Sequence, residues 1–454
     1  MTWLVPREEL TIAQSRAVEL NPKEHRLILG SPGSGKTVVL LHRSRHLADE
    51  YQVQPDRYRI FVFTRTLKAY IRSALDDLEL PEGCVVTFDS WCSDYYLKHI
   101  GKRLPIKLSE KPDKKRDKGG EDKPRHETDF DAIRQAVWER TRALPANERW
   151  FDFVLVDEGQ DLNIQAFEIL KSIAQHVTVF MDHKQQLYET GADEAGILQA
   201  LGLHKHNLSL LEAYRCSPYI VQVAASFIPH LAEREAFLRQ PRTAQTERQT
   251  PLLYLASTIE DEKAHLIEMV RNRINKNDRI AVLFPQKRHV YGYAHALWEA
   301  GLEVEVPETP WQNRKHKADS SAKKKPKTKK ASDPTLPTIN FGSPLPKLMP
   351  YPSAKGLTFD TVLMPRLIPG LFAHLNQERL ERWLFVGITR ATQWVYFSTL
   401  NDNRFMFLDQ FQQLEQRQQA TIKLSDDLLT NPSSAFIREF EGDEDDNDDL
   451  SDQF

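Results

Sequence analysis

Cysteines are scarce and scattered in this chain of 454 residues, at Cys84, Cys92 and Cys216. Their spacing matches no metal-binding pattern, and we expect no disulfide framework. Long apolar runs are also missing, so no segment is predicted to span a bilayer. The first ten residues have neither the basic start nor the apolar core of a signal peptide. These absences favour a cytoplasmic protein without a membrane partner.

Charge is distributed unevenly along the sequence. The formal net charge is −3, yet residues 441–454 alone carry eight acidic residues and no basic one. The rest of the chain therefore carries +5, the difference between −3 and −8. A mildly basic body is typical of proteins that bind polyanions, and we expect the acidic tail, residues 426–454, to be disordered.

Short apolar runs alternate with helical patterns over residues 1–205 and again over residues 206–425. In the first part, strands are predicted at 26–29, 60–63, 84–88, 153–156 and 177–181, and a helix at 36–47. In the second part, strands are predicted at 208–211, 280–284, 302–306, 361–364 and 395–398, and a helix at 293–300. Continuous β-branched runs between helices predict parallel sheets that are buried on both faces. We therefore predict an α/β fold with two lobes, each built on a parallel sheet.

Two charged segments interrupt this pattern, at residues 108–126 and 312–337. The second holds nine basic residues and one acidic residue between Gln312 and Lys330. Both are predicted to be surface insertions, within residues 101–130 and 310–340. Contact with a phosphate backbone is the alternative to simple solvation.

Residues 30–37 fit the complete pattern G-x-x-x-x-G-K-[ST], between a predicted strand and a predicted helix. The eight residues are Gly30, Ser31, Pro32, Gly33, Ser34, Gly35, Lys36 and Thr37. Glycines let successive amide N–H groups turn towards a phosphate, and the helix N-terminus adds partial positive charge. We expect Lys36 to reach the β- and γ-phosphates of ATP and the Thr37 hydroxyl to bind Mg²⁺. A chance glycine-rich turn would not require the Lys-Thr pair.

A cluster of acidic residues follows the apolar run 153–156, in the sequence Asp157-Glu158-Gly159-Gln160-Asp161. A carboxylate at the C-terminal end of a buried parallel strand lies where such sheets bind ligands. Asp157 is therefore expected to hold Mg²⁺, and Glu158 to polarise the water that attacks the γ-phosphate. The alternative is that an aspartate here only caps a helix.

These motifs and their order resemble the UvrD/Rep-like DNA helicases of superfamily 1 over residues 8–400, in a compact form without large accessory subdomains. The resemblance implies two RecA-like P-loop lobes. Gln14, in Leu10–Gln14, matches the family's Q motif, in which the glutamine reads adenine. Asp182 and Gln185 match the motif that senses the γ-phosphate.

The second lobe carries three further matches to the family. Tyr214 and Arg215, in the segment 211–215, correspond to a tyrosine that stacks on adenine and an arginine that reaches the γ-phosphate. The segment 353–357 resembles the core of the "SAKGLEF" motif, whose Gly356 is expected beside the nucleotide. The segment 386–391 matches "VGVTRA", which makes Arg390 a second arginine finger. Surface salt bridges are the alternative role of both arginines.

The resemblance also implies a path for a nucleic-acid strand. Its predicted contacts are Phe63, Thr64, Arg65, Thr87, Phe88, Trp91, Ser353 and Lys355. Burial in the lobe core is the alternative for the three aromatic residues.

The match to the family is weaker on the strand side than on the nucleotide side. Glu189 and Thr190 stand where the family often has a Trp-Arg pair, and Pro350 and Pro352 stand where Thr and His are common. Thr358 replaces a glutamate that contacts ribose. We expect less base stacking and more reliance on phosphate charge.

The implied function is an ATP-dependent translocase or helicase on single-stranded DNA, with 3′-to-5′ polarity and RNA as another possible substrate. An alternative is a non-unwinding, nucleic-acid-stimulated ATPase subunit that works with a nuclease in DNA repair or antiphage defence. A scaffold that uses nucleotide only to lock its shape is a third. The acidic end with its terminal Phe454 resembles the tip of bacterial single-strand-binding proteins, which docks on partner enzymes. Solvation or shielding of a basic groove are the other roles open to it.

Overall fold

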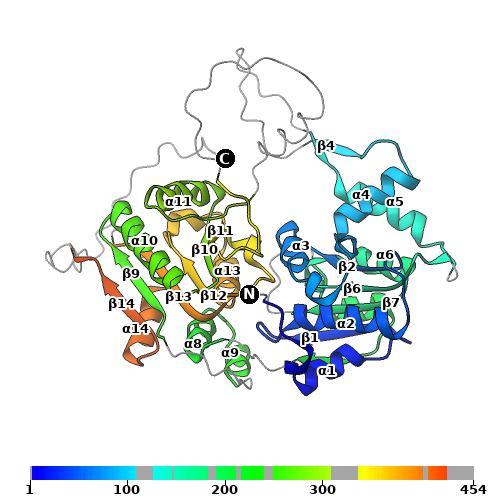
Figure 1. Ribbon diagram of the computed structural model, residues 1–454, viewed down its shortest axis with the longest axis horizontal. Helices are drawn as coiled ribbons and strands as arrows, with labels where there is room; N and C mark the ends of the chain where they lie inside the picture. The colour runs from blue at the N-terminus through cyan, green and yellow to red at the C-terminus, as the bar shows by residue number, and fades with distance from the viewer. Residues whose placement is uncertain are drawn as a thin grey trace, which may run out of the picture.

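The computed structural model describes residues 3–108, 126–145, 148–182, 191–210, 216–239, 249–307, 336–401 and 407–426. It contains two six-stranded parallel sheets, one in each of two lobes that lie side by side (Figure 1). The predicted α/β class with two parallel-sheet lobes is confirmed. Most of both charged insertions and nearly all of the acidic tail lie outside the described residues.

The first sheet has the strand order β3-β2-β6-β7-β1-β8. Its strands are β1 (Arg26–Gly30), β2 (Tyr58–Val62), β3 (Val85–Thr87), β6 (Phe151–Val156), β7 (Ala174–Met181) and β8 (Leu208–Leu210). Its helices are α1 (Ile12–Glu19), α2 (Lys36–Glu50), α3 (Arg65–Arg72), α4 (Phe88–His99), α5 (Phe130–Thr141), α6 (Ile164–Ile173) and α7 (Glu194–Leu201). An antiparallel pair, β4 (Ile106–Leu108) and β5 (His126–Thr128), projects from this lobe beside α4 and α5 (Figure 1).

The second sheet has the order β11-β10-β12-β13-β9-β14. Its strands are β9 (Leu252–Ala256), β10 (Ile280–Phe284), β11 (Lys347–Pro350), β12 (Phe359–Met364), β13 (Ala391–Leu400) and β14 (Thr421–Leu424). Its helices are α8 (Pro218–Ser226), α9 (Leu231–Leu238), α10 (Ile259–Asn275), α11 (Lys287–Glu299), α13 (Gln377–Ile388) and α14 (Leu408–Gln416). Short 3-10 turns include η5 (Gly159–Asp161) after β6 and η7 (Tyr351–Ala354) after β11.

Three sequence predictions need correction. The strand at 208–210 pairs with β1 in the first sheet, although the sequence placed it in the second lobe. Residues 302–306 form no regular strand and contribute only single bridges, from Glu305 and Val306. The strand predicted at 84–88 ends at Thr87, because Thr87 caps α4 and Phe88 is already helical.

Alternate residues of the central strands pack into different cores, as expected for sheets covered on both faces. In β6, Phe153 and Leu155 join one cluster of buried apolar side chains, and Val154 and Val156 join another. The first of these clusters also contains residues of the second lobe, so apolar packing continues across the junction of the lobes. Within the described part of the chain, no helix is both long and apolar enough to cross a membrane.

Candidate active site

The phosphate-binding loop closes over its own lysine. Gly33 and Gly35 have φ of +76° and +80°, a region that glycine adopts without strain. Lys36 begins α2, and its Nζ donates to the carbonyl oxygens of Gly30 at 2.8 Å and Ser31 at 3.1 Å. It also lies 3.3 Å from Asp182 Oδ2 at the end of β7. The ammonium group is thereby held over the concave side of the loop.

The interior of this loop fits a phosphate group. The Ser34 hydroxyl is fully buried and has no hydrogen-bond partner among the described residues. Buried polar groups are normally satisfied, so this hydroxyl and the ammonium of Lys36 suit an anionic ligand oxygen. A Cβ at Gly30 would come within 2.6 Å of Ser34 Oγ, and glycine keeps that space open.

Gln14 connects helix α1 to the same loop. Its Oε1 accepts a hydrogen bond from the Thr11 backbone at 3.0 Å, and its Nε2 donates to the Ser34 carbonyl at 3.0 Å. A Cβ at Gly35 would lie 2.7 Å from that Nε2. Gln14 therefore lies against the phosphate loop, as the Q-motif resemblance requires.

A buried arginine that the sequence analysis missed holds α1 in this position. Arg43 of α2 is fully buried and donates to the carbonyls of Ala17, Val18 and Leu20 at the end of α1. Burial lowers the pKa of Arg43 to about 9, and the carbonyls compensate for the lost water. Arg43 follows the apolar run 38–41 of α2, and because Arg45 lies only two residues away, nothing in the sequence distinguishes Arg43 as the buried arginine.

The two predicted magnesium ligands lie in contact. Thr37 Oγ1 donates to Asp157 Oδ2 at 2.8 Å, and Asp157 is 1% exposed at the end of β6. Burial, followed by the negative charge of Glu158, raises the pKa of Asp157. Mg²⁺ typically binds one or two protein oxygens together with phosphate oxygens and water. The pair therefore fits a magnesium–nucleotide complex.

Glu158 is held in a strained and positively charged environment. Its φ is +53°, in the left-handed region that non-glycine residues enter at a cost, and it is 3% exposed. Burial alone would raise the pKa of Glu158, but the positive charges of Lys355, Lys36 and Arg390 outweigh it and lower the pKa. The carboxylate is therefore kept in the ionised form that accepts a proton.

Gln160 orients this carboxylate. Its Nε2 donates to Glu158 Oε2, and its Oε1 accepts from the Asp182 backbone at 3.0 Å. Gln160 is fully buried, so both bonds are protected from water. The side chain links the turn after β6 to the segment after β7.

The second lobe completes the site with residues that precede β12 and β13. Arg390 is 5% exposed and lines a cavity together with Lys36, Thr37 and Glu158. Its guanidinium donates to the carbonyls of Val386 at 2.9 Å and Leu357 at 3.3 Å. Thus groups from both lobes surround one cavity.

Two close contacts join the lobes beside the cavity. Lys355 Nζ lies 2.6 Å from Asp161 Oδ1, and the two side chains are 3% and 1% exposed. Gly356, with φ +77°, lies against α3, where an added Cβ would be 2.9 Å from Leu67. Lys355 was expected on the nucleic-acid path, and here its charge is paired inside the protein.

Comparisons with known proteins agree with this geometry. A family model described as an AAA domain matches residues 14–191. A "Probable DNA helicase" of Mycoplasma pneumoniae is 21% identical over 275 residues, which cover 56% of this chain and 44% of that protein. A "Probable DNA helicase II homolog" of the same organism is 25% identical over 167 residues, covering 32% of this chain and 23% of that protein.

The resemblance to the UvrD/Rep-like helicases is confirmed. The chain spans less than half the length of these two curated relatives. A solved C-terminal domain of a possible DNA helicase from Lactobacillus is 14% identical, with a TM-score of 0.28, and covers 41% of this chain and 88% of that one.

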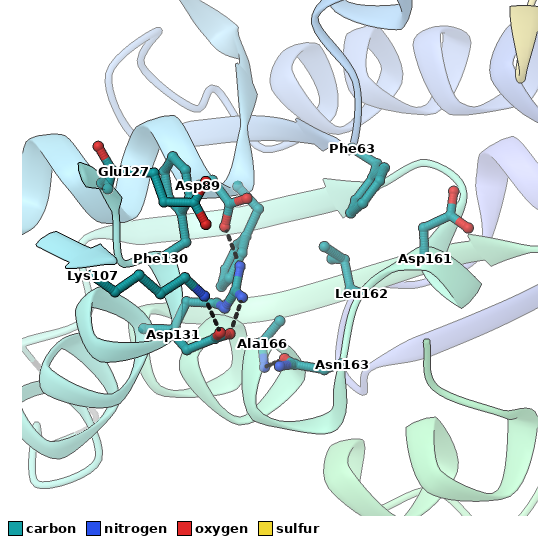
Figure 2. A pocket seen from close by; sticks show the side chains of 13 residues that line it. Phe63, Asp89, Lys107, Glu127, Phe130, Asp131, Asp161, Leu162, Asn163 and Ala166 are labelled. Carbon is teal, nitrogen blue, oxygen red and sulfur yellow. Dashed lines mark hydrogen bonds and ion pairs between the residues drawn. The ribbon is translucent and has the colours of Figure 1, made fainter. Parts of the chain in front are cut away.

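Two of the predicted strand contacts, Phe63 and Phe88, line a second cavity, which lies in the first lobe after the C-terminal ends of β2, β3 and β6 (Figure 2). Phe63, Phe88, Asp161 and Leu162 line it from the core side. On the opposite side Arg134 pairs with Asp89 at 2.6 Å and with Asp131 at 2.5 Å (Figure 2). The cavity is therefore lined both by apolar side chains and by paired charges.

The predicted strand contacts differ in exposure. Arg65 is exposed and Phe63 is half-buried, whereas Phe88 is only 2% exposed and packs edge-on to Phe61 at 6.0 Å. Trp91 also packs on Phe61, at 5.9 Å. Phe88 and Trp91 thus support the lobe core, the alternative left open by the sequence.

The hydroxyls on this side have local roles. Thr64 and Thr87 cap α3 and α4, and Ser353 lies half-buried in η7. Gln185, Tyr214 and Arg215, as well as Glu189 and Thr190, lie outside the described residues.

Proposed function

We propose that this chain is an ATP-dependent translocase or helicase of the UvrD type, which moves 3′ to 5′ along single-stranded DNA. The observation that carries the proposal is the cavity between the lobes. It is lined by Lys36 and Glu158 from the first lobe and by Arg390 from the second.

In this proposal each of these residues has its own role in ATP hydrolysis. Lys36 and the loop amides hold the β- and γ-phosphates, and Glu158 aligns the attacking water and accepts its proton. Thr37 and Asp157 would hold Mg²⁺, which neutralises phosphate charge. Arg390 stabilises the charge that develops on the γ-phosphate, a role that arginines perform well because they are planar and always ionised.

The same arrangement couples chemistry to motion. Arg390 reaches the phosphates only when the lobes approach, so bound ATP favours the closed arrangement and its hydrolysis releases it. A strand that contacts both lobes would then be gripped alternately. The apolar and charged cavity beside Phe63 is the proposed place of that strand on the first lobe.

A second candidate is a nucleic-acid-stimulated ATPase subunit that does not unwind duplex and works with a nuclease in DNA repair or antiphage defence. Glu189, Thr190, Pro350 and Pro352 favour it, because they replace strand-side residues of the family. Strand displacement on duplexes with long 3′ overhangs separates the two. Rapid ATP hydrolysis without displacement would support the subunit.

The decisive test is the ATPase rate with and without single-stranded DNA or RNA. We expect stimulation by the strand and loss of turnover in Glu158→Gln, with ATP still bound. Glu378→Gln, on the exposed side of α13, is the matched control and should hydrolyse ATP normally. Turnover that survives in Glu158→Gln would contradict the assignment of the base.

A further inference from the structure

The inter-lobe cavity is also lined by an aromatic pair that the proposed phosphate chemistry does not use. Trp3 and Tyr70 line this cavity together with Gly35, Thr37 and Val38. Their rings are stacked, with centroids 4.2 Å apart and planes 15° from parallel. The lining of the cavity therefore combines the cationic side chains of Lys36 and Arg390 with two aromatic side chains.

Contacts on both sides fix the orientation of these rings. Trp3 Nε1 donates to Ser73 Oγ at 3.2 Å, and Trp3 is 8% exposed. Tyr70 packs edge-on to Phe341 of the second lobe, with centroids 5.2 Å apart. The described chain begins between the two lobes (Figure 1), which brings its third residue to the nucleotide cavity.

The pair also lines a third cavity. That cavity shares Trp3, Tyr70 and Thr358 with the inter-lobe cavity and is lined further by Phe341 of the second lobe. A planar group that extends from the phosphate loop along the cleft would therefore meet the indole ring.

We propose that Trp3, backed by Tyr70, is the stacking wall for the base of the bound nucleoside triphosphate. This inference rests on the proposed ATPase function and adds a base-binding residue to it. Aromatic side chains stack on every nucleobase, since each base has a π-face. Trp3 therefore contributes affinity for any base, and Gln14 of α1, which contacts the phosphate loop, is left to distinguish adenine.

The proposal separates ligands that carry a base from those that do not. Trp3→Leu keeps an apolar side chain but removes the stacking face, so ATP and ADP should bind on the order of tenfold more weakly. Inorganic tripolyphosphate has no base, and its dissociation constant should not change. Trp3→Phe should retain most of the affinity for ATP. Trp298→Leu, at a 37% exposed tryptophan of α11, is the matched control and should change neither ligand.

The affinities of ATP, ADP and tripolyphosphate are to be measured by calorimetry on the full chain, first on the unmodified protein. Weaker binding of ATP and tripolyphosphate to the same degree in Trp3→Leu would overturn the proposal, because the ring would then only support the loop. Unchanged ATP affinity would overturn it as well. Failure of the unmodified protein to bind any nucleotide would instead refute the proposed function itself, before any variant is compared.

Discussion

The buried ion pair between Asp161 and Lys355 should hold the two lobes together. Its ends lie 194 residues apart in the sequence, and both side chains are almost fully buried. Removing one partner of such a pair typically costs about 3–5 kcal/mol, because the remaining charge is buried without a counter-ion. We expect Lys355→Met and Asp161→Asn each to lower the free energy of unfolding, by up to this amount.

The pKa of Asp161 sets the conditions of the experiment. Burial raises the pKa of Asp161 to about 6, although the charge of Lys355 opposes the shift. In Lys355→Met this opposition is lost, so Asp161 would take up a proton near neutral pH and the measured cost would shrink. The double-mutant cycle should therefore be measured by urea denaturation at pH 8, where Asp161 of the unmodified protein is ionised.

The cycle yields the coupling energy between the two side chains. We expect it to exceed about 2 kcal/mol, because an exposed pair reaches only about 0.2–1 kcal/mol and a buried pair is screened much less. The exposed pair of Glu378 and Arg382 on α13, at 2.7 Å, provides an internal comparison and should give a few tenths of a kcal/mol. A coupling for Asp161 and Lys355 as small as that of the control pair would mean that water separates the lobes, and would refute the reasoning.

Three further outcomes follow from single side chains. Gln160→Met should reduce kcat for ATP on the order of a hundredfold with little change in KM, since Glu158 loses its orienting donor; a pure KM effect would contradict this role. Gly356→Ala should lower the melting temperature by several degrees, because the new methyl meets Leu67 at a φ of +77°; an unchanged melting temperature would show that the contact is loose. Burial lowers the pKa of His265 to about 4, so the folded state favours its neutral form and loses stability as the pH falls from 6.5 towards 4. His265→Gln should remove part of this loss in urea titrations at pH 7.5 and 5, and an identical loss would assign it to other groups.

The parts of the candidate site for which the sequence is most informative are local. The phosphate loop is a run of eight residues whose chemistry depends on its own backbone, and the turn after β6 follows an unmistakable apolar strand. In contrast, β8 is three residues long, and nothing in Leu208–Leu210 indicates that its partner is β1 rather than a strand of the second lobe. Parallel strands that pair are far apart in the sequence, and the few residues of a short strand do not specify which strand lies beside it.

Residues whose role depends on a partner far away in the sequence cannot be identified from motifs alone. Arg43 donates hydrogen bonds to carbonyl groups about 25 residues earlier, and Trp3 lines a cavity together with a loop that begins at Gly30. Lys355 lies within a motif assigned to the strand path, but only the structure reveals that it faces Asp161. Phe88 has the same sequence signature whether it stacks on a base or fills a core, because an aromatic side chain suits both.

The turn after β6 connects the proposed nucleotide site to the second lobe. Its first carboxylate, Asp157, contacts the proposed magnesium ligand Thr37, and its last, Asp161, pairs with Lys355 of the other lobe. Between them Glu158 is held in a left-handed conformation and takes its charge environment from both lobes. Withdrawing the second lobe would remove two of the three positive charges that lower the pKa of Glu158, while Lys36 remains. Separation would therefore change the charge environment of Glu158 at the same moment as it moves Arg390 away from the cavity, so one motion would alter both the proposed base and the proposed arginine finger.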